Sequence, residues 1–193
     1  MNHLAQAVLD FWFRAPGEPE YHRTRAEWFR KDDAFDAQIR TRFGALIEQA
    51  LAGDLAGWAA HPAPAVAQIV VLDQFTRNVF RGSARAFAGD TLALAAARAL
   101  VASGADRAMP GVRRQFVYLP FEHAEDLACQ DESIRLFTQL GRDEPALADL
   151  LPWAERHHEI IVRFGRFPHR NALLGRASSA EETAFLQQPG SSF

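Results

Sequence analysis

The chain has 193 residues, of which 48% are hydrophobic and 23% are charged, an ordinary globular composition that excludes a disordered chain. Its formal net charge of −3 provides no overall positive field, so we expect no nucleic-acid partner. The first residues lack the pattern of a signal peptide, and no apolar run is long enough to span a bilayer. We therefore expect a cytoplasmic protein without a membrane partner, folded as one domain over residues 1–193.

The first half of the chain has hydrophobic residues at helical spacing. An amphipathic helix is predicted around residues 4–12, and Asp33 is predicted to cap a second helix that ends near Gly53. The run from Ile69 to Val71 is the only strand-like signal, and its flanks favour a buried helix instead. Residues 90–104 form a further helical unit that ends in glycine.

The second half continues this pattern. Asp131 is predicted to open a short helix, and a longer one follows, with Pro152 either kinking or dividing it. Ser179 and Glu182 form a capping box before the last helix. An apolar last residue, Phe193, follows a Pro-Gly turn, and we expect it to pack against the body of the protein. The sequence thus predicts an all-α fold built as an array of helical hairpins, tetratricopeptide-like although without a strict repeat.

Three segments place polar residues among large apolar ones. In the first, Asp73 and Arg77 are one helical turn apart and can form an ion pair. The second surrounds His123 with acidic residues, and the third combines four arginines with His169 and contains no acid. The segments cover residues 72–82, 118–130 and 163–176.

Two interpretations of these segments remain open. In the first, the arginines only pair with Glu122, Glu125 and Asp126, and the contacts lock the helix packing. In the second, the arginines converge on a small anionic ligand and an acid or histidine moves protons, so that the protein could be an enzyme. The candidate catalytic residues are Glu122, His123 and His169. The candidate ligand-binding residues are Arg77, Arg81, Arg166, Arg170 and Asn171.

Cofactor and metal sites have little support. The glycine-rich loops that cradle phosphates are missing, and Lys31 is the only lysine among 21 lysines and arginines. Glu155 and His158 have the spacing of di-iron bundle ligands, but a second such pair is missing. A site formed by His123, Asp126 and His157 is the remaining alternative. We expect no cofactor and no stoichiometric metal.

Five blocks of the sequence, taken in order, resemble one bacterial family. It is catalogued as domain of unknown function number nine hundred and twenty-four, and the resemblance implies a tetratricopeptide-like, all-helical fold with no established activity. Thr76 stands where we expect proline in that family. The blocks are residues 8–13, 72–82, 120–126, 163–171 and 189–193.

The resemblance leaves a second function open, because tetratricopeptide-like helices can offer a concave groove to a peptide or protein partner. Such a scaffold would spread its working residues along the exposed faces of successive repeats. Here the polar residues gather in three segments rich in Phe, Pro and Gly. This gathering favours one compact small-molecule site over a scaffold.

Overall fold

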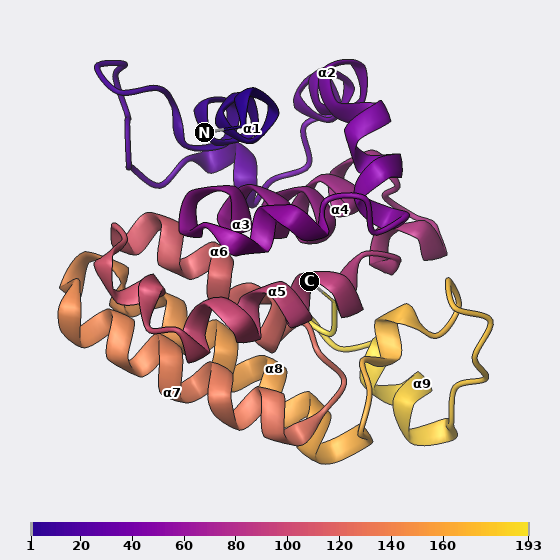
Figure 1. The fold of residues 1–193 in the computed structure, drawn as a ribbon. Coiled ribbons are helices and arrows are strands. Elements are labelled where there is room, and N and C mark those ends of the chain that lie inside the picture. The colour runs from indigo at the N-terminus through magenta and orange to yellow at the C-terminus, as the bar shows by residue number, and fades with distance from the viewer. Residues whose placement is uncertain (1, 193) are drawn as a thin grey trace.

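The computed structural model describes residues 2–192, which form α-helices and short 3-10 helices without a β-strand (Figure 1). The all-α prediction is therefore confirmed, whereas Phe193 and its expected packing lie outside the described residues. The α-helices are α1 (His3–Phe13), α2 (Asp33–Leu51), α3 (Pro62–Ile69), α4 (Thr76–Val79), α5 (Asp90–Ala102), α6 (Gly111–Glu122), α7 (Leu127–Asp143), α8 (Leu151–Phe164) and α9 (Ala180–Leu186). The 3-10 helices are Ala26–Trp28, Ala56–Ala60, Ala84–Phe87, Ala105–Ala108, Pro145–Leu150 and Pro168–Arg170.

Helix α3 and the helical turns that follow it form the centre of the fold. Helices α1 and α2 lie on one side of this central element, and α5 and α6 lie on the other (Figure 1). From α5 to α8, each helix packs against the next one. The central helix is covered from both sides, which explains why its sequence is apolar almost all round. Within residues 2–192, no helix has the length and apolar character needed to cross a membrane.

Aromatic rings from distant segments meet around Trp12, at the end of α1. Its ring lies 5.8 Å from that of Trp28, and 5.5 Å from those of Phe75 and Phe116. Trp12, Phe75 and Phe116 have no exposed surface. Each such aromatic side chain contributes a large apolar area, and the tilted contacts add to it. This cluster fixes α1 onto the central helix and onto α6.

Helix α2 begins one residue earlier than predicted. The carboxylate of Asp32 accepts hydrogen bonds from the amides of Ala34 and Phe35, both at 3.0 Å. Asp32, rather than Asp33, is therefore the cap. In a run of two aspartates, local spacing alone offers no reason to prefer either one.

Helix α7 begins well before the predicted start at Asp131. Asp126 caps it by accepting a hydrogen bond from the amide of Cys129 at 2.9 Å. In the sequence, Asp126 follows Glu122 and Glu125, so residue type alone did not distinguish it as the cap. Pro152 lies in the first turn of α8, where its missing N–H costs nothing, so it starts this helix and does not kink it.

The run that begins at Ile69 is a buried helix, as predicted, but it changes to a π-helix over Val70–Phe75. The wider turn displaces the usual hydrogen bonds, and side chains take their place. The hydroxyl of Thr76 donates to the carbonyl of Leu72 at 2.7 Å, and Arg77 Nη1 donates to the carbonyl of Asp73 at 2.9 Å. Single π-helical turns are frequent at functional sites.

The segment after α8, residues 165–192, shares a small apolar cluster with that helix. Ile160, Ile161 and Phe167 form this cluster apart from the main core. Polar contacts join the segment to the body: Arg176 forms two hydrogen bonds with Glu125, at 2.6 and 2.8 Å. The predicted capping box at Ser179 and Glu182 is present at the start of α9.

We predict that Gly89→Ala destabilises the protein by about 1–3 kcal/mol, the usual cost of overpacking. A Cβ at Gly89 would collide with the carbonyl of Leu72 in the π-helix, so α5 would have to move away. Urea unfolding measures the change. Gly44→Ala in α2 is the matched control, because a Cβ there meets no atom within 4 Å. The control should gain about 0.5–1 kcal/mol from better helix propensity, and an equal gain in Gly89→Ala would contradict the prediction.

Candidate functional site

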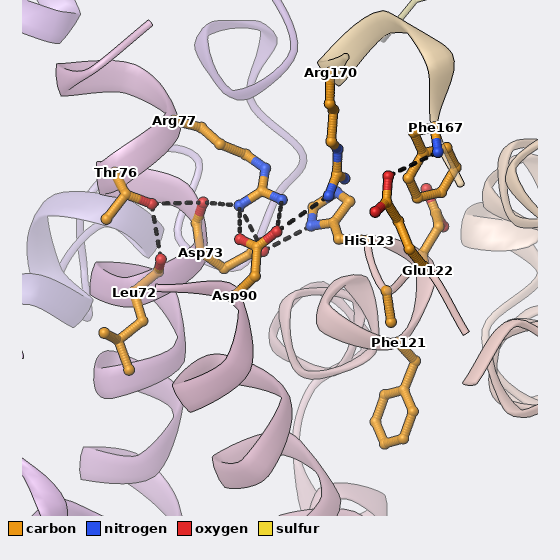
Figure 2. A network of polar contacts seen from close by, with 12 residues as sticks. Leu72, Asp73, Thr76, Arg77, Asp90, Phe121, Glu122, His123, Phe167 and Arg170 are labelled. Carbon is orange, nitrogen blue, oxygen red and sulfur yellow. Dashed lines mark hydrogen bonds and ion pairs between the residues drawn. The ribbon is translucent and has the colours of Figure 1, made fainter. Parts of the chain in front are cut away.

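The side chain of Asp73 lies at the centre of a buried polar network (Figure 2). It has no exposed surface. Its Oδ1 lies 3.0 Å from Arg77 Nη1 and 2.6 Å from His123 Nδ1, and its Oδ2 accepts a hydrogen bond from Gln74 at 2.5 Å. The predicted pair of Asp73 and Arg77 is therefore present, and His123 joins it from the end of α6.

A second carboxylate, Asp90 at the start of α5, extends the network. Arg77 binds it with two hydrogen bonds of 2.7 and 3.0 Å, and Arg170 Nη1 approaches it at 3.3 Å. Figure 2 shows both guanidinium groups directed toward Asp90 from different parts of the chain. We refer to Asp73, Arg77, Asp90, His123 and Arg170 as the Asp73 network.

The charges of this network are fixed by its contacts. Burial alone would raise the pKa of Asp73, but the charge of Arg77, the charge that His123 carries in acid, and hydrogen bonds from His123 and Gln74 hold that pKa well below its usual range. Burial and the charge of Arg77 lower the pKa of His123 despite the opposing effect of Asp73. His123 is therefore neutral near pH 7, with Nδ1–H donating to an ionised Asp73.

Glu122 and His157 form a second buried pair behind the network. His157 Nδ1 lies 3.1 Å from Glu122 Oε1 and 2.8 Å from the carbonyl of Trp153. Burial, followed by the charge of Asp73, raises the pKa of Glu122 to about 8, and burial lowers that of His157 to about 3. Although the distance would suit an ion pair, both shifts favour the uncharged forms. Near neutral pH, both members of the pair are therefore uncharged.

Arg170 is held between two aromatic rings. Its guanidinium carbon lies 4.7 Å from the ring centre of Phe87 and 4.6 Å from that of Phe167. Only 6% of the residue is exposed, and its Nε has no hydrogen-bond partner among the described residues. Burial, followed by the charge of Arg77, lowers its pKa to about 10. Arg170 thus carries a buried charge with one long hydrogen bond.

The structure brings part of the predicted site together. Arg77, His123 and Arg170 meet in the Asp73 network, Glu122 lies next to His123 in the chain, and the ring of His169 lies 5.8 Å from that of Phe167. Burial and the charge of Arg170 lower the pKa of His169 to about 4.

Three predicted ligand-binding residues have other partners. Arg81 pairs with Asp36 of α2 at 3.2 Å, and Arg166 pairs with Glu182 of α9 at 2.7 Å. Asn171 is buried and holds the loop after it, where its Oδ1 accepts from Arg176 at 3.0 Å. These interactions position the loops around the network and leave Arg81, Arg166 and Asn171 outside it.

Of the three acids that the purely structural interpretation paired with arginines, only Glu125 has an arginine partner, and this partner is Arg176 and not Arg77, Arg81, Arg166 or Arg170. Glu122 contacts His157, Asp126 caps α7, and Glu125 binds Arg176. The acids in the network are instead Asp73, one turn from its arginine, and Asp90. The first turn of a helix is where an acidic residue stabilises the dipole, so no separate signal in the sequence distinguished Asp90.

No arrangement of three or more His, Cys, Asp or Glu residues able to hold a metal ion occurs within the described part of the chain. Two hollows of about 390 and about 420 Å³ lie elsewhere, one beside α1 and α2 and one beside α8 and α9. Neither is lined by a residue of the Asp73 network.

Comparisons with known proteins agree with the fold described above. Residues 8–190 match the model of a family described as bacterial proteins of unknown function, DUF924. The chain belongs to this family. A solved structure of a protein of unknown function from Agrobacterium tumefaciens, ATU0120, is 39% identical, with a TM-score of 0.84 over 96% of this chain and 97% of that one. No curated protein matches the chain. The function of this DUF924 member is uncharacterised, and the fold agrees with that of its relative.

We predict that Arg77→Ala destabilises the protein by about 3 kcal/mol or more, because it leaves the buried charge of Asp73 without its main cation. Chemical denaturation measures the change. Arg85→Ala removes the same charge from an exposed pair with Glu48 and should have little effect. Equal effects of the two substitutions would contradict the structural role of Arg77.

We also predict a pH effect from Glu122. Its pKa of about 8 lies above the ordinary value of 4.5, so between these values the folded chain keeps a proton that the unfolded chain has lost. Stability therefore falls as pH rises through this range. The lowered pKa values of His157 and His169 make stability rise with pH below their ordinary value of 6.5. The effect of Glu122 is therefore measured best between pH 6.5 and 8.

Across that window, the free energy of unfolding should fall by about 1–2 kcal/mol. Glu122→Gln, which cannot ionise, should remove most of this fall. Urea unfolding of both proteins at the two ends of the window measures it. The same slope in both proteins would mean that Glu122 is already ionised at neutral pH.

Proposed function

We propose that the protein binds a small anion, a carboxylate or a phosphate, against Arg170. The observation that supports this proposal is that the buried guanidinium of Arg170 has too few hydrogen-bond acceptors. Arg170 is stacked between Phe87 and Phe167, has one hydrogen bond of 3.3 Å and keeps a buried Nε without a partner among the described residues. A buried charge is costly unless it is paired and hydrogen-bonded.

The acids of the network do not meet this need. Asp90 already accepts two shorter hydrogen bonds from Arg77, and Asp73 is bound by Arg77 and His123. Arginine presents a rigid fork of donors that matches a carboxylate or phosphate, so a ligand oxygen suits the donors that these acids leave unfilled.

The partly exposed members of the network provide a route for such a ligand. The side chains of Arg77 and Asp90 are 21% and 22% exposed, and that of His123 is 15% exposed. Asp73 and Glu122 are buried behind them. A small anion can therefore reach the network from this rim while Asp73 and Glu122 stay shielded from water.

The pair of Asp73 and His123 offers proton chemistry at the same place. A carboxylate 2.6 Å from Nδ1 fixes the ring and its tautomer, which leaves Nε2 as the basic nitrogen. Glu122, protonated near neutral pH, adds a neutral acid next to it. We propose that a bound substrate would use His123 as its base, with Glu122 as a proton donor.

A tetratricopeptide-like scaffold for a peptide or protein is the second candidate. It would use exposed apolar side chains such as Trp153 and Val162 on α8, which are 55% and 60% exposed. The small-anion proposal has the stronger basis, because the unusual polar groups are concentrated in one buried network. We also propose a cytoplasmic location, which suits a chain whose one cysteine, Cys129, is free.

We predict that millimolar phosphate or a small carboxylate raises the melting temperature, as any ligand of the folded state does. Arg170→Ala should abolish the rise. It should itself cost less than about 1 kcal/mol or even stabilise the protein, because it removes a poorly satisfied buried charge and leaves Asp90 bound to Arg77. A thermal-shift screen with phosphate, acetate and succinate measures both effects.

Arg85→Ala is the matched control and should respond as the wild type does, since Arg85 pairs with Glu48 on the surface. No response of the wild type to any of the anions would overturn the proposal. An equal response in Arg170→Ala would do so too.

A further inference from the structure

The hollow beside α1 and α2 is a second concentration of unusual polar groups. Its volume of about 390 Å³ lies within the range of small-molecule sites. Four carboxylates and three guanidinium groups line it, over a floor that includes Phe11 and Phe35. The hollow shares no residue with the Asp73 network, so a ligand bound in it would be independent of the anion proposed at Arg170.

Arg25 anchors the wall of this hollow. It is 5% exposed, and its Nη1 donates to the carbonyls of Phe11 and Trp12 at 2.8 and 2.9 Å, while Nη2 binds Glu27 at 2.8 Å. The two carbonyls belong to the last turn of α1, where the helix itself offers no partner. Arg25 Nε is buried and has no hydrogen-bond partner within the described residues. A residue that lines the hollow therefore has a buried N–H donor with no acceptor among the described residues.

Two further arginines at the hollow have no carboxylate partner. The guanidinium carbon of Arg42 lies 4.7 Å from the ring centre of Phe11, and no ion pair or hydrogen bond joins the side chain of Arg42 or Arg14 to another described residue. The hydrogen bond from its own amide and the contact with Arg25 lower the pKa of Glu27, and the charge of Arg14 adds a smaller effect. The backbone of Arg14, at φ 68° and ψ 157°, has a conformation that is nearly exclusive to glycine.

Two carboxylates that line the same hollow, Asp10 and Glu18, are held by hydrogen bonds from uncharged donors. Asp10 accepts a hydrogen bond from the side chain of Gln6 at 2.6 Å, and Glu18 accepts one from the amide of Ala15 at 2.5 Å. Neither forms an ion pair with a described residue. Apart from the pair of Arg25 and Glu27, charges of both signs therefore face one hollow with no ion pair between them among the described residues.

We infer that this hollow binds a small zwitterion that carries both a carboxylate and an ammonium group, the chemistry of a free amino acid. The ligand carboxylate lies against Arg14 and Arg42, whose guanidinium groups face the open side of the hollow and have no carboxylate partner among the described residues. Its ammonium group lies against Asp10 and Glu18, which have lone pairs to spare. A ligand with only a negative charge would meet these two acids and be repelled, so the mixed lining selects for both groups.

Isothermal titration of the full chain with each of the common L-amino acids tests this inference. At least one should bind. Its N-acetyl derivative lacks the ammonium group and its amide lacks the carboxylate, and each should bind about tenfold weaker or worse, as expected when one charge-assisted contact is lost. Failure of every amino acid to bind would overturn the inference, as would an N-acetyl derivative or inorganic phosphate that binds equally well.

Matched variants locate the ligand. Arg42→Gln and the nearly isosteric Asp10→Asn should each weaken binding about tenfold or more, whereas Arg85→Gln outside the hollow should not. Circular dichroism confirms that each variant is folded. Arg170→Ala should leave amino-acid binding unchanged, which separates this site from the Asp73 network. Binding that is lost in Arg170→Ala and kept in both hollow variants would overturn the assignment.

Discussion

The ion pair between Asp73 and Arg77 is the contact on which the arrangement of the middle of the protein depends. An ionised carboxylate with no exposed surface is tolerated only where cations and donors surround it, and here they come from its own helix and from α6. Arg77 comes from the next turn of the same helix and also reaches Asp90, while His123 arrives from the end of α6. Helix α5, helix α6 and the central helix are thus oriented by one buried charge as well as by apolar contacts.

The π-helix gives this charge its position. Within the wider turn at Val70–Phe75, the carbonyls of Leu72 and Asp73 accept hydrogen bonds from the side chains of Thr76 and Arg77. Gly89 allows α5 to approach the Leu72 carbonyl closely, which brings Asp90 within reach of Arg77. The polar network and the irregular backbone therefore support each other, and neither follows from helix propensity.

The sequence predicted the helices better than it predicted their contacts. Hydrophobic spacing and caps such as Ser179 depend on neighbours a few residues apart, so they can be recognised in the chain itself. The pair of Asp73 and Arg77 was accessible for the same reason. The partners of Arg81 and Arg166, which are Asp36 and Glu182, lie in other elements and depend on how the helices pack. The stacking of Arg170 between two rings likewise arises only in the folded chain.

The manner in which residues 165–192 are attached has a consequence for the neighbouring network. The apolar cluster that they share with α8 is small, and ion pairs such as that between Arg176 and Glu125 also join them to the body. Such partly exposed pairs weaken as dissolved ions screen them, whereas the aromatic cluster around Trp12 does not. This segment carries both Arg170 and Phe167, so it is the part of the molecule that a rise in ionic strength loosens first. An anion bound at Arg170 would tie this segment to the body, and occupancy of the site would then be coupled to the order of the C-terminal region.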